Sequence, residues 1–349
     1  MIAKYQPYIL NFKQASGTSR GIIKTKETWF IIIEGNGKFG IGECGLFRGL
    51  SVDDRPDYEA KLKWVCEHIF LGLNDLLDEL TEFPSIQFGL EQAFKSFQSD
   101  SPFQLFPSKF SRGSASIPIN GLIWMGSESF MRAQIRDKIE AGFSCIKMKI
   151  GAIDFETELN LIKSIRNEFS ARDITLRVDA NGAFLPNDAI EKLKRLSDYE
   201  LHSIEQPIKQ GQIDAMARLC EGTPLPIALD EELIGVISVT NQLELLQTIK
   251  PQFIILKPSL VGGWQGSRSW IDNAEANGIG WWITSALESN VGLNAIAQWT
   301  YTLDSNLPQG LGTGSLFTNN IESPLYVKNG TLQYKTNDKW SLSLLNFKL

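Results

Sequence analysis

Two lysines, Lys147 and Lys149, lie two residues apart in the short run CIKMKIG. In a β-strand, residues i and i+2 point to the same face, so both ammonium groups face one way and Met148 faces the other. A solvent-facing strand edge is one interpretation of this pattern. In a barrel, whose outer face is covered by helices, both lysines would instead point inward near the mouth. Mutual repulsion and partial burial would then lower a lysine pKa towards neutrality, as a general base requires.

Three acidic residues end successive apolar runs, in RVDAN, SIEQP and IALDE: they are Asp179, Glu205 and Asp230. Each one alone is typical of a helix cap or a loop. Carboxylates that converge from three neighbouring strands would repel one another, and a divalent cation removes that repulsion. An all-oxygen ligand set favours Mg²⁺, with Mn²⁺ as the alternative. Zinc is disfavoured because the chain has only two histidines.

Further polar residues follow at the ends of later runs. Lys257, in FIILKP, is expected across the barrel mouth from the first two lysines, with the carboxylates between them. Ser285 and Ser289, in ITSALESNVGL, offer hydroxyls that would hold a substrate carboxylate. For Ser289 the alternative is a capping role at a helix start. Asn181, two residues beyond Asp179, shares its face if the strand geometry persists.

The elements that must position these residues repeat along the chain. Short β-like runs alternate with longer amphipathic segments, and one distinctive residue stands near the end of each run, at intervals of 25 to 30 residues: Asn120, Lys149, Asp179, Glu205, Asp230, Lys257, Ser285 and Gly312. A βα unit needs about 30 residues, so eight units predict an α/β fold with a (β/α)8-type barrel over residues 114–317. An open doubly wound sheet is the alternative, but its Gly-rich phosphate turn is missing.

The ends of the chain read differently. Residues 1–113 predict an α+β capping domain, with a hairpin turn at Asn36–Gly37 and two helices, near 57–70 and 85–97. Ser85 is the expected N-cap of the second helix. Residues 318–349 carry a second Asn-Gly turn and are expected to pack back on the capping domain as a C-terminal segment.

Composition limits the classes of function. Hydrophobic residues make up 43% of the 349 residues and the net charge is −6, which indicates a globular protein and argues against nucleic-acid binding. No apolar run is long enough for a membrane span and no signal peptide is evident. Four scattered cysteines suggest a cytoplasmic protein. GNGKFG lies in the predicted hairpin and opens no helix, so it is not a dinucleotide site. The oligomeric state stays open.

The motifs KMK, RVDAN, IEQP, ALDE and ILKPS follow one another as in the enolase superfamily, which the sequence resembles over nearly its whole length. Members of that superfamily use a Lys or His base together with Mg²⁺. Lysines on the second and sixth strands resemble the muconate lactonizing subgroup, and SALESNVGL resembles the seventh-strand segment of the o-succinylbenzoate synthases. This resemblance implies dehydration of a small dicarboxylate, 2-succinyl-6-hydroxy-2,4-cyclohexadiene-1-carboxylate, to o-succinylbenzoate in menaquinone biosynthesis.

The resemblance also implies roles for single residues. Lys149 matches the acid/base lysine and Lys257 the opposing lysine that stabilises an enediolate. The three carboxylates named above match the metal ligands. The positions that match substrate contacts are Lys147, Asn181, Ser285, Ser289 and, in a capping loop, Arg20. Arg48, in the other capping loop, is better interpreted as an ordinary solvated arginine.

Two other functions remain open. One base on each face of a substrate also suits a dipeptide epimerase or an N-succinylamino acid racemase. Dipeptide epimerases typically carry Asp-x-Asp at the eighth strand, where this chain reads QGLGTGSLF. A non-catalytic barrel that serves as a scaffold is disfavoured because both lysines and all three carboxylates are present.

Overall fold

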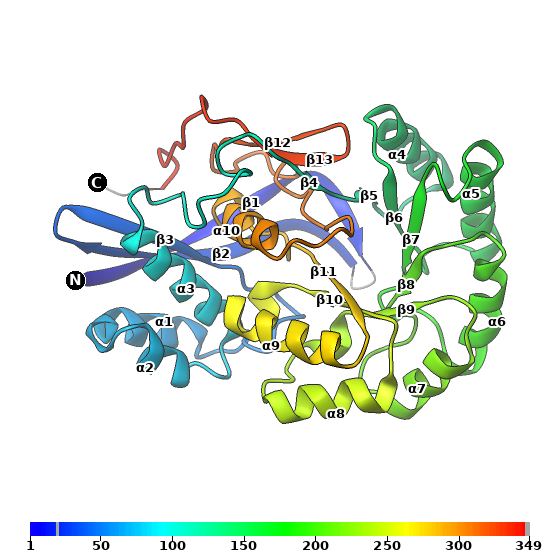
Figure 1. Ribbon diagram of the computed structural model, residues 1–349, viewed down its shortest axis with the longest axis horizontal. Helices are drawn as coiled ribbons and strands as arrows, with labels where there is room; N and C mark the ends of the chain where they lie inside the picture. The colour runs from blue at the N-terminus through cyan, green and yellow to red at the C-terminus, as the bar shows by residue number, and fades with distance from the viewer. Residues whose placement is uncertain (19–20, 346–349) are drawn as a thin grey trace.

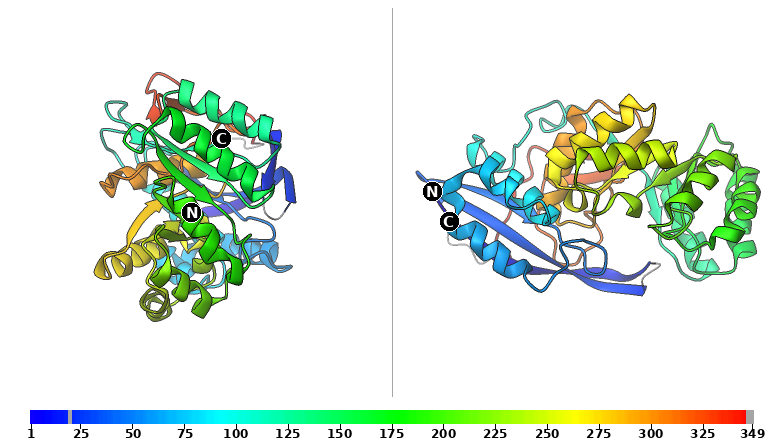
Figure 2. Two further views of the ribbon diagram at one scale, coloured as in Figure 1. Left: turned by 90° about the vertical axis from the view of Figure 1, so that its right-hand side faces the viewer. Right: turned by 90° about the horizontal axis from the view of Figure 1, so that it is seen from below.

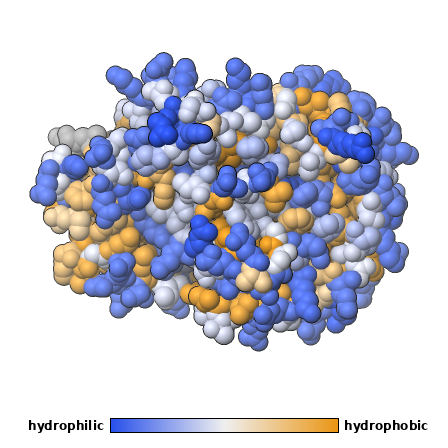
Figure 3. Space-filling view, viewed as in Figure 1, coloured by the Kyte–Doolittle hydropathy of each residue, from blue (hydrophilic) through white to orange (hydrophobic). Residues whose placement is uncertain are grey.

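The computed structural model describes residues 1–18 and 21–345, which form three sheets (Figure 1). One sheet is antiparallel and has three strands, a second is parallel and has seven, and a third is a small antiparallel sheet of three strands. In the second view of Figure 2 the N-terminal helices (blue) lie at one end of the molecule and the first helices of the parallel sheet (green) at the other, with the long N-terminal strands running between them. No helix among the described residues is both long and apolar enough to cross a membrane, and Figure 3 shows hydrophilic side chains over much of one face.

The N-terminal sheet is a three-stranded meander with helices on one face. Its elements are β1 (Ile2–Thr18), β2 (Gly21–Gly35), β3 (Lys38–Cys44), α1 (Tyr58–Glu67), η1 (Ile69–Leu71), α2 (Leu73–Asp78) and α3 (Pro84–Gln98). Asn36 and Gly37 have φ values of 52° and 72°, as a two-residue hairpin turn requires, so the predicted turn is confirmed. Gly42 lets α3 lie close to β3, because a Cβ there would come within 1.9 Å of the Gly89 carbonyl oxygen.

Ser85 is not the N-cap of α3, and that prediction is wrong. The helix begins at Pro84 with Phe83 as its N-cap residue, and no side chain caps it. Proline suits the first helical position because its missing N–H would have had no partner there. Ser85 is fully buried and donates both its backbone N–H and its hydroxyl to Asp53 Oδ2, at 2.9 and 2.6 Å.

The strands of the parallel sheet alternate along the chain with helices. The strands are β5 (Gly121–Ile123), β6 (Cys145–Lys149), β7 (Thr175–Asp179), β8 (Ser203–Glu205), β9 (Ile227–Leu229), β10 (Phe253–Leu256) and β11 (Gly280–Ile283). The helices are α4 (Glu128–Glu140), α5 (Phe155–Glu168), α6 (Pro186–Ser197), α7 (Ile213–Gly222), α8 (Val239–Ile249), α9 (Gly263–Ala276) and α10 (Asn290–Thr302), with short turns η2 (Glu231–Leu233) and η3 (Pro258–Leu260). Serine or aspartate side chains cap four of the helices, α4, α5, α8 and α10.

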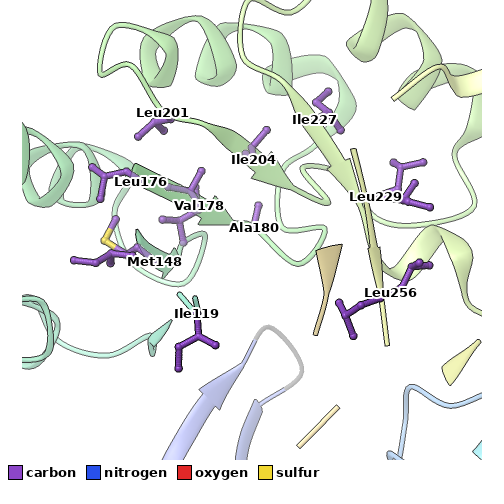
Figure 4. Packing of buried hydrophobic residues seen from close by; sticks show 14 of the residues in the cluster. Ile119, Met148, Leu176, Val178, Ala180, Leu201, Ile204, Ile227, Leu229 and Leu256 are labelled. Atoms are coloured by element: carbon purple, nitrogen blue, oxygen red, sulfur yellow. The ribbon is translucent and has the colours of Figure 1, made fainter. Parts of the chain in front are cut away.

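Alternation along each strand separates the two faces of this sheet. Met148, Val178 and Ile204 belong to the large buried cluster that packs against the helices (Figure 4). Their neighbours Lys147, Lys149, Asp179 and Glu205 therefore point to the other face. The apolar packing that holds each strand against its helix thus also aims the polar side chains inward.

The first and eighth predicted runs differ from simple strands. SIPINGLIW divides into β4 (Ile117–Pro118), which pairs with β13, and β5, which begins the parallel sheet. In the eighth run, Gln309 and Gly310 form isolated parallel bridges with Ile119 and Thr284. The Asn120 N–H donates to the Gln309 carbonyl at 2.9 Å, and the Gly310 N–H to the Ile283 carbonyl at 2.8 Å. These two residues hence contact both ends of the seven-stranded sheet.

The C-terminal segment touches both other parts of the chain. Its hairpin, β12 (Leu325–Lys328) and β13 (Thr331–Tyr334), turns at Asn329–Gly330 and extends β4. At its start the Thr318 N–H donates to the Asn11 carbonyl at 2.8 Å, and further along Trp340 stacks on Phe103 with ring centroids 4.1 Å apart.

Candidate active site

A cavity of about 290 Å³ lies at the carboxyl ends of the parallel strands. Lys147, Lys149 and Asp179 line it from β6 and β7, and Lys257 follows β10 on the other side. The N-terminal part of the chain contributes Gln14, Phe47 and Leu50 to the cavity wall. Active sites of (β/α)-type sheets lie at this end of the strands, and the volume is close to the lower limit for ligand pockets, about 300 Å³.

The lysines of β6 are paired with carboxylates of the next two strands. Lys147 Nζ lies 2.7 Å from Glu205 Oε2 and 3.3 Å from Asp179 Oδ2. Lys149 Nζ lies 2.9 Å from Asp179 Oδ2 and 2.5 Å from Asn181 Oδ1. The strand register explains this arrangement, because Asp179 is the partner of both Lys149 and Glu205 in the sheet.

Lys257 occupies the corresponding place on the other side of the carboxylates. Its ammonium group forms an ion pair with Asp230 Oδ2, which follows β9. In the order β10-β9-β8-β7-β6, the two lysine-bearing positions flank the three strands that end in acids. The structure thus brings together Lys147, Lys149, Lys257 and all three carboxylates that the sequence pattern singled out.

Asn181 reaches the site by a different route from the one expected. Strand β7 ends at Asp179, and Asn181 has φ 43°, so the strand geometry does not persist. Its backbone N–H donates to Asp179 Oδ1 at 3.0 Å and its side-chain amide to Glu231 Oε1 at 3.1 Å. The turn returns the side chain to the cavity, which it lines.

The pKa values of the buried carboxyls diverge. Burial favours the neutral form of Asp179, but the nearby ammonium groups of Lys149 and Lys147 outweigh it and hold its pKa well below the usual range. Burial and the charge of Asp179 raise the pKa of Glu205 to about 7. Burial also raises the pKa of Asp230, although Lys257 opposes that effect. Neighbouring acids with divergent pKa values are typical of functional sites.

The prediction that burial and repulsion lower the pKa of a lysine is wrong for Lys147. Burial does act in that direction, but the attraction of Glu205 and Asp179 is larger and raises the pKa above its ordinary value. Burial likewise acts to lower the pKa of Lys257, but the charges of Asp230, Glu205 and Glu231 together outweigh burial and raise it. Repulsion between the lysines is thus outweighed by the carboxylates between them.

Asp179, Glu205 and Asp230 provide oxygen ligands for a metal ion, although in this structure all three carboxylates form ion pairs with lysines. As they stand, no three His, Cys, Asp or Glu side chains of residues 1–18 and 21–345 are arranged to hold a metal ion. The Lys147 ammonium group lies between Asp179 and Glu205, and an ammonium group is the alternative counter-ion to a metal. Glu205 Oε1 is buried with no hydrogen-bond partner, so it is available as a ligand. The three acids consequently fit a hard divalent cation in their chemistry.

The two predicted serines have different environments. Ser285 lines the cavity, and its hydroxyl donates to Glu288 Oε2 at 2.5 Å. Ser289 is fully buried, caps α10 by accepting from the Val291 N–H, and donates its hydroxyl to Glu43 Oε2 at 2.5 Å. Ser289 is not among the residues that line the cavity, and in this structure it has the capping role that the sequence analysis gave as the alternative.

The capping loops contribute residues that the sequence analysis did not single out. Arg20 lies outside the described residues. Arg48 forms ion pairs with Glu27 and Asp54, both at 2.7 Å, as a solvated arginine. Phe47, next to it, lines the cavity instead. The sequence gives no sign that an apolar side chain in a loop lies at a site. Phe47 is placed there only because the N-terminal sheet packs against the parallel sheet.

Comparison with known proteins places this chain in a family. Residues 130–338 match the family described as Enolase C-terminal domain-like. The o-succinylbenzoate synthase of Desulfotalea psychrophila is 45% identical in an alignment of 363 positions, gaps included, which covers 95% of this chain and 98% of that protein. The crystal structure of MenC from Desulfotalea psychrophila LSv54 superimposes with a TM-score of 0.85 and 42% identity over 95% of this chain and 99% of that one.

A more distant relative covers only part of the chain. The L-Ala-D/L-Glu epimerase of Bacillus subtilis is 28% identical over 50% of this chain and 47% of that protein. The long, nearly complete match to the Desulfotalea synthase is far stronger evidence than this partial one. The chain belongs to the enolase superfamily and, within it, to the o-succinylbenzoate synthase family.

Proposed function

We propose that this protein is a Mg²⁺-dependent o-succinylbenzoate synthase, which dehydrates 2-succinyl-6-hydroxy-2,4-cyclohexadiene-1-carboxylate to o-succinylbenzoate in menaquinone biosynthesis. One observation carries the proposal: Lys149 and Lys257 reach the same cavity from opposite sides of three acid-bearing strands. The 45% identity to the Desulfotalea enzyme along 95% of the chain supports the choice of substrate.

Asp179, Glu205 and Asp230 would hold the metal, with Mn²⁺ as a possible substitute for Mg²⁺. When bound, the cation supplies positive charge that stabilises an enediolate. Lys147, which now bridges two of these carboxylates, is assigned to the substrate side of the site together with Asn181 and Ser285.

Lys149 acts as the acid and base of the proposed reaction. As the neutral amine it takes the proton from the substrate carbon that bears the carboxylate, and the electron pair of that C–H bond moves into the carboxylate to form the enediolate. The resulting ammonium group then donates its proton to the 6-hydroxyl, the C–O bond breaks, and water leaves as the ring becomes aromatic. One lysine serves both steps because the proton and the hydroxyl lie on the same face of the ring in a syn elimination.

Lys257 has the complementary role. Its raised pKa keeps it protonated beside Asp230, so it stabilises negative charge on the enediolate from the opposite side. Proton abstraction is assigned to Lys149, the lysine that the family resemblance matches to the acid/base position.

The domain organisation belongs to the same proposal. Residues 1–113 form the capping domain, 114–317 a (β/α)8-type barrel, and 318–349 the returning segment. Gln309 and Gly310, bridged to Ile119 and Thr284, take the place of the eighth strand and close the barrel. All four cysteines are free, which is consistent with a cytoplasmic location.

Epimerization is the second candidate function, because lysines on both sides of a substrate carbon suit removal of a proton from one face and return to the other. It would act on dipeptides or N-succinylamino acids. The absence of an acid pair from QGLGTGSLF disfavours the dipeptide version.

Absorbance of the aromatic product tests the proposal directly. The cyclohexadiene substrate is mixed with purified protein and Mg²⁺, and we expect rapid formation of o-succinylbenzoate. Removal of metal by a chelator should stop the reaction and added Mg²⁺ should restore it. Full activity in metal-free protein would assign the three acids a structural role. Folded protein that makes no product would favour epimerization, which deuterium exchange into N-succinylamino acids and dipeptides would detect.

A further inference from the structure

Two buried polar groups in the cavity wall have no hydrogen-bond partner. Asn120 and Thr284 both line the cavity and are only 5% and 8% exposed. Asn120 Oδ1 and Thr284 Oγ1 are enclosed, and neither forms a hydrogen bond within the described residues. Buried polar atoms are nearly always paired, so an unpaired one in a ligand cavity indicates a group that the ligand completes.

The two residues lie on either side of Gly310. The Asn120 N–H donates to the carbonyl of the preceding residue, Gln309, and Thr284 bridges to Gly310 itself. A Cβ on Gly310 would lie 2.4 Å from Thr284 Oγ1, so glycine leaves the space that the hydroxyl occupies.

In the order of the parallel sheet, this part of the wall lies beyond the strands that carry the acids and the lysines. Asn120 directly precedes β5 and Thr284 directly follows β11, the two ends of the seven-stranded sheet. Glu205 ends β8, the central strand of the same sheet. A ligand held at the acids by one end would therefore present its other end to Asn120 and Thr284.

Ser285, the residue expected to hold a substrate carboxylate, has no proton to offer. Its hydroxyl donates to Glu288 Oε2, and its oxygen accepts from Thr313 Oγ1 at 2.9 Å and from the Leu287 N–H at 3.1 Å. The Thr284 hydroxyl and the Asn120 amide are uncommitted by comparison. Rotation of the amide exchanges its oxygen and nitrogen, so Asn120 can present a donor to the ligand.

We infer that Asn120 and Thr284 form the subsite for the distal carboxylate of the substrate's succinyl side chain, with the ring carboxylate held at the lysine and acid end of the cavity. This inference rests on the proposed function.

Calorimetric binding of two ligands to the Mg²⁺-loaded enzyme tests the subsite. o-Succinylbenzoate carries the distal carboxylate, whereas 2-butanoylbenzoate keeps the ring carboxylate and the ketone but lacks it. We expect Thr284→Val to weaken binding of o-succinylbenzoate about 10-fold or more, the effect of one lost hydrogen bond to a charged group, and to leave 2-butanoylbenzoate unchanged. Asn120→Asp should have the same selectivity through repulsion. Thr284→Ser should restore binding.

Two controls separate this effect from damage to the fold. Thr248→Val makes the same chemical change at an exposed site on α8 and should alter neither affinity. Because the Thr284 hydroxyl has no partner without ligand, Thr284→Val should not lower the melting temperature of the ligand-free protein.

Two outcomes would overturn the inference while the wild-type enzyme still dehydrates its substrate. Equal weakening of both ligands would assign the pair to the ketone or to the general shape of the cavity. Unchanged affinity for o-succinylbenzoate in Thr284→Val and Asn120→Asp would show that neither residue contacts it. A wild-type protein that binds o-succinylbenzoate but forms no product would instead count against the proposed function.

Discussion

Lys147 and Lys149 share one face of β6 but have different surroundings. Lys147 is held between two carboxylates, and its side chain is 8% exposed. Lys149 contacts Asp179 and the neutral side chain of Asn181. A group locked between two negative charges keeps its proton, whereas a base must release it in each cycle. The difference in pairing supports Lys149, rather than its neighbour, as the proposed base.

Replacement of the proposed base tests this assignment. Lys149→Ala should reduce turnover by about 10²- to 10⁴-fold, the usual contribution of general acid–base catalysis, while circular dichroism and thermal unfolding show an intact fold. Lys163→Ala, an exposed lysine on α5, is the matched control and should keep full activity. A substantially active Lys149→Ala enzyme would contradict the mechanism.

The start of α10 is anchored by a residue of the N-terminal sheet. Glu43, on β3, accepts hydrogen bonds from the backbone N–H groups of Ser289 and Gly292, at 2.8 and 2.9 Å, as well as from the Ser289 hydroxyl. A carboxylate at a helix N-terminus is favoured by the unpaired N–H groups and the helix dipole. The N-terminal sheet thereby holds the loop that carries Ser285, four residues earlier.

Ser289→Ala separates capping from substrate binding. The variant loses the cap of α10 and one hydrogen bond to Glu43, so its free energy of unfolding should fall by about 1–2 kcal/mol. Its KM should match that of the wild type, because the side chain does not line the cavity. Denaturant titration and steady-state kinetics measure the two quantities. A raised KM with unchanged stability would return Ser289 to the substrate site.

Glu91 joins α3, which packs on the N-terminal sheet, to α9, which follows β10. Its carboxylate accepts from the backbone N–H groups of Trp264 and Gln265, at the start of α9. The residue is 6% exposed, and this burial raises its pKa to about 7 from an ordinary value of 4.5. The junction between the two parts of the molecule is therefore sensitive to protonation near neutral pH.

The stability of the whole molecule should reflect this titration. A carboxyl whose pKa is raised by folding contributes stability that is full below about pH 4.5 and is lost as the pH rises through about 7. Relative to Glu91→Gln, which does not titrate, the wild type should lose about 3 kcal/mol of unfolding free energy over that range. Denaturant titrations of both proteins at several pH values measure the difference. A difference independent of pH would contradict the raised pKa.

Much of the arrangement of the site residues could be predicted from the amino-acid sequence alone. Apolar and polar residues alternate in CIKMKIG and RVDAN, and alternation decides which side chains share a face. Regular spacing then predicts that Asp179 and Glu205 end neighbouring parallel strands, and the register pairs them. The Asn36–Gly37 turn could also be predicted from the sequence, since few residues other than glycine and asparagine adopt its backbone conformation.

Other features depended on contacts between segments far apart in the chain. Ser85 and Ser289 both look like helix caps in the sequence. Ser85 instead lies within α3 and donates to Asp53, whereas Ser289 does cap α10 and also donates to Glu43, 246 residues away. The direction of the Lys147 pKa shift likewise follows from two carboxylates on other strands. Thus the local sequence determined which residues share a face and which strand ends they occupy, because backbone periodicity is a short-range property. The tertiary structure alone decided their partners, their burial and their charge, because hydrogen bonds and electrostatic energies depend on distances that only the folded chain defines.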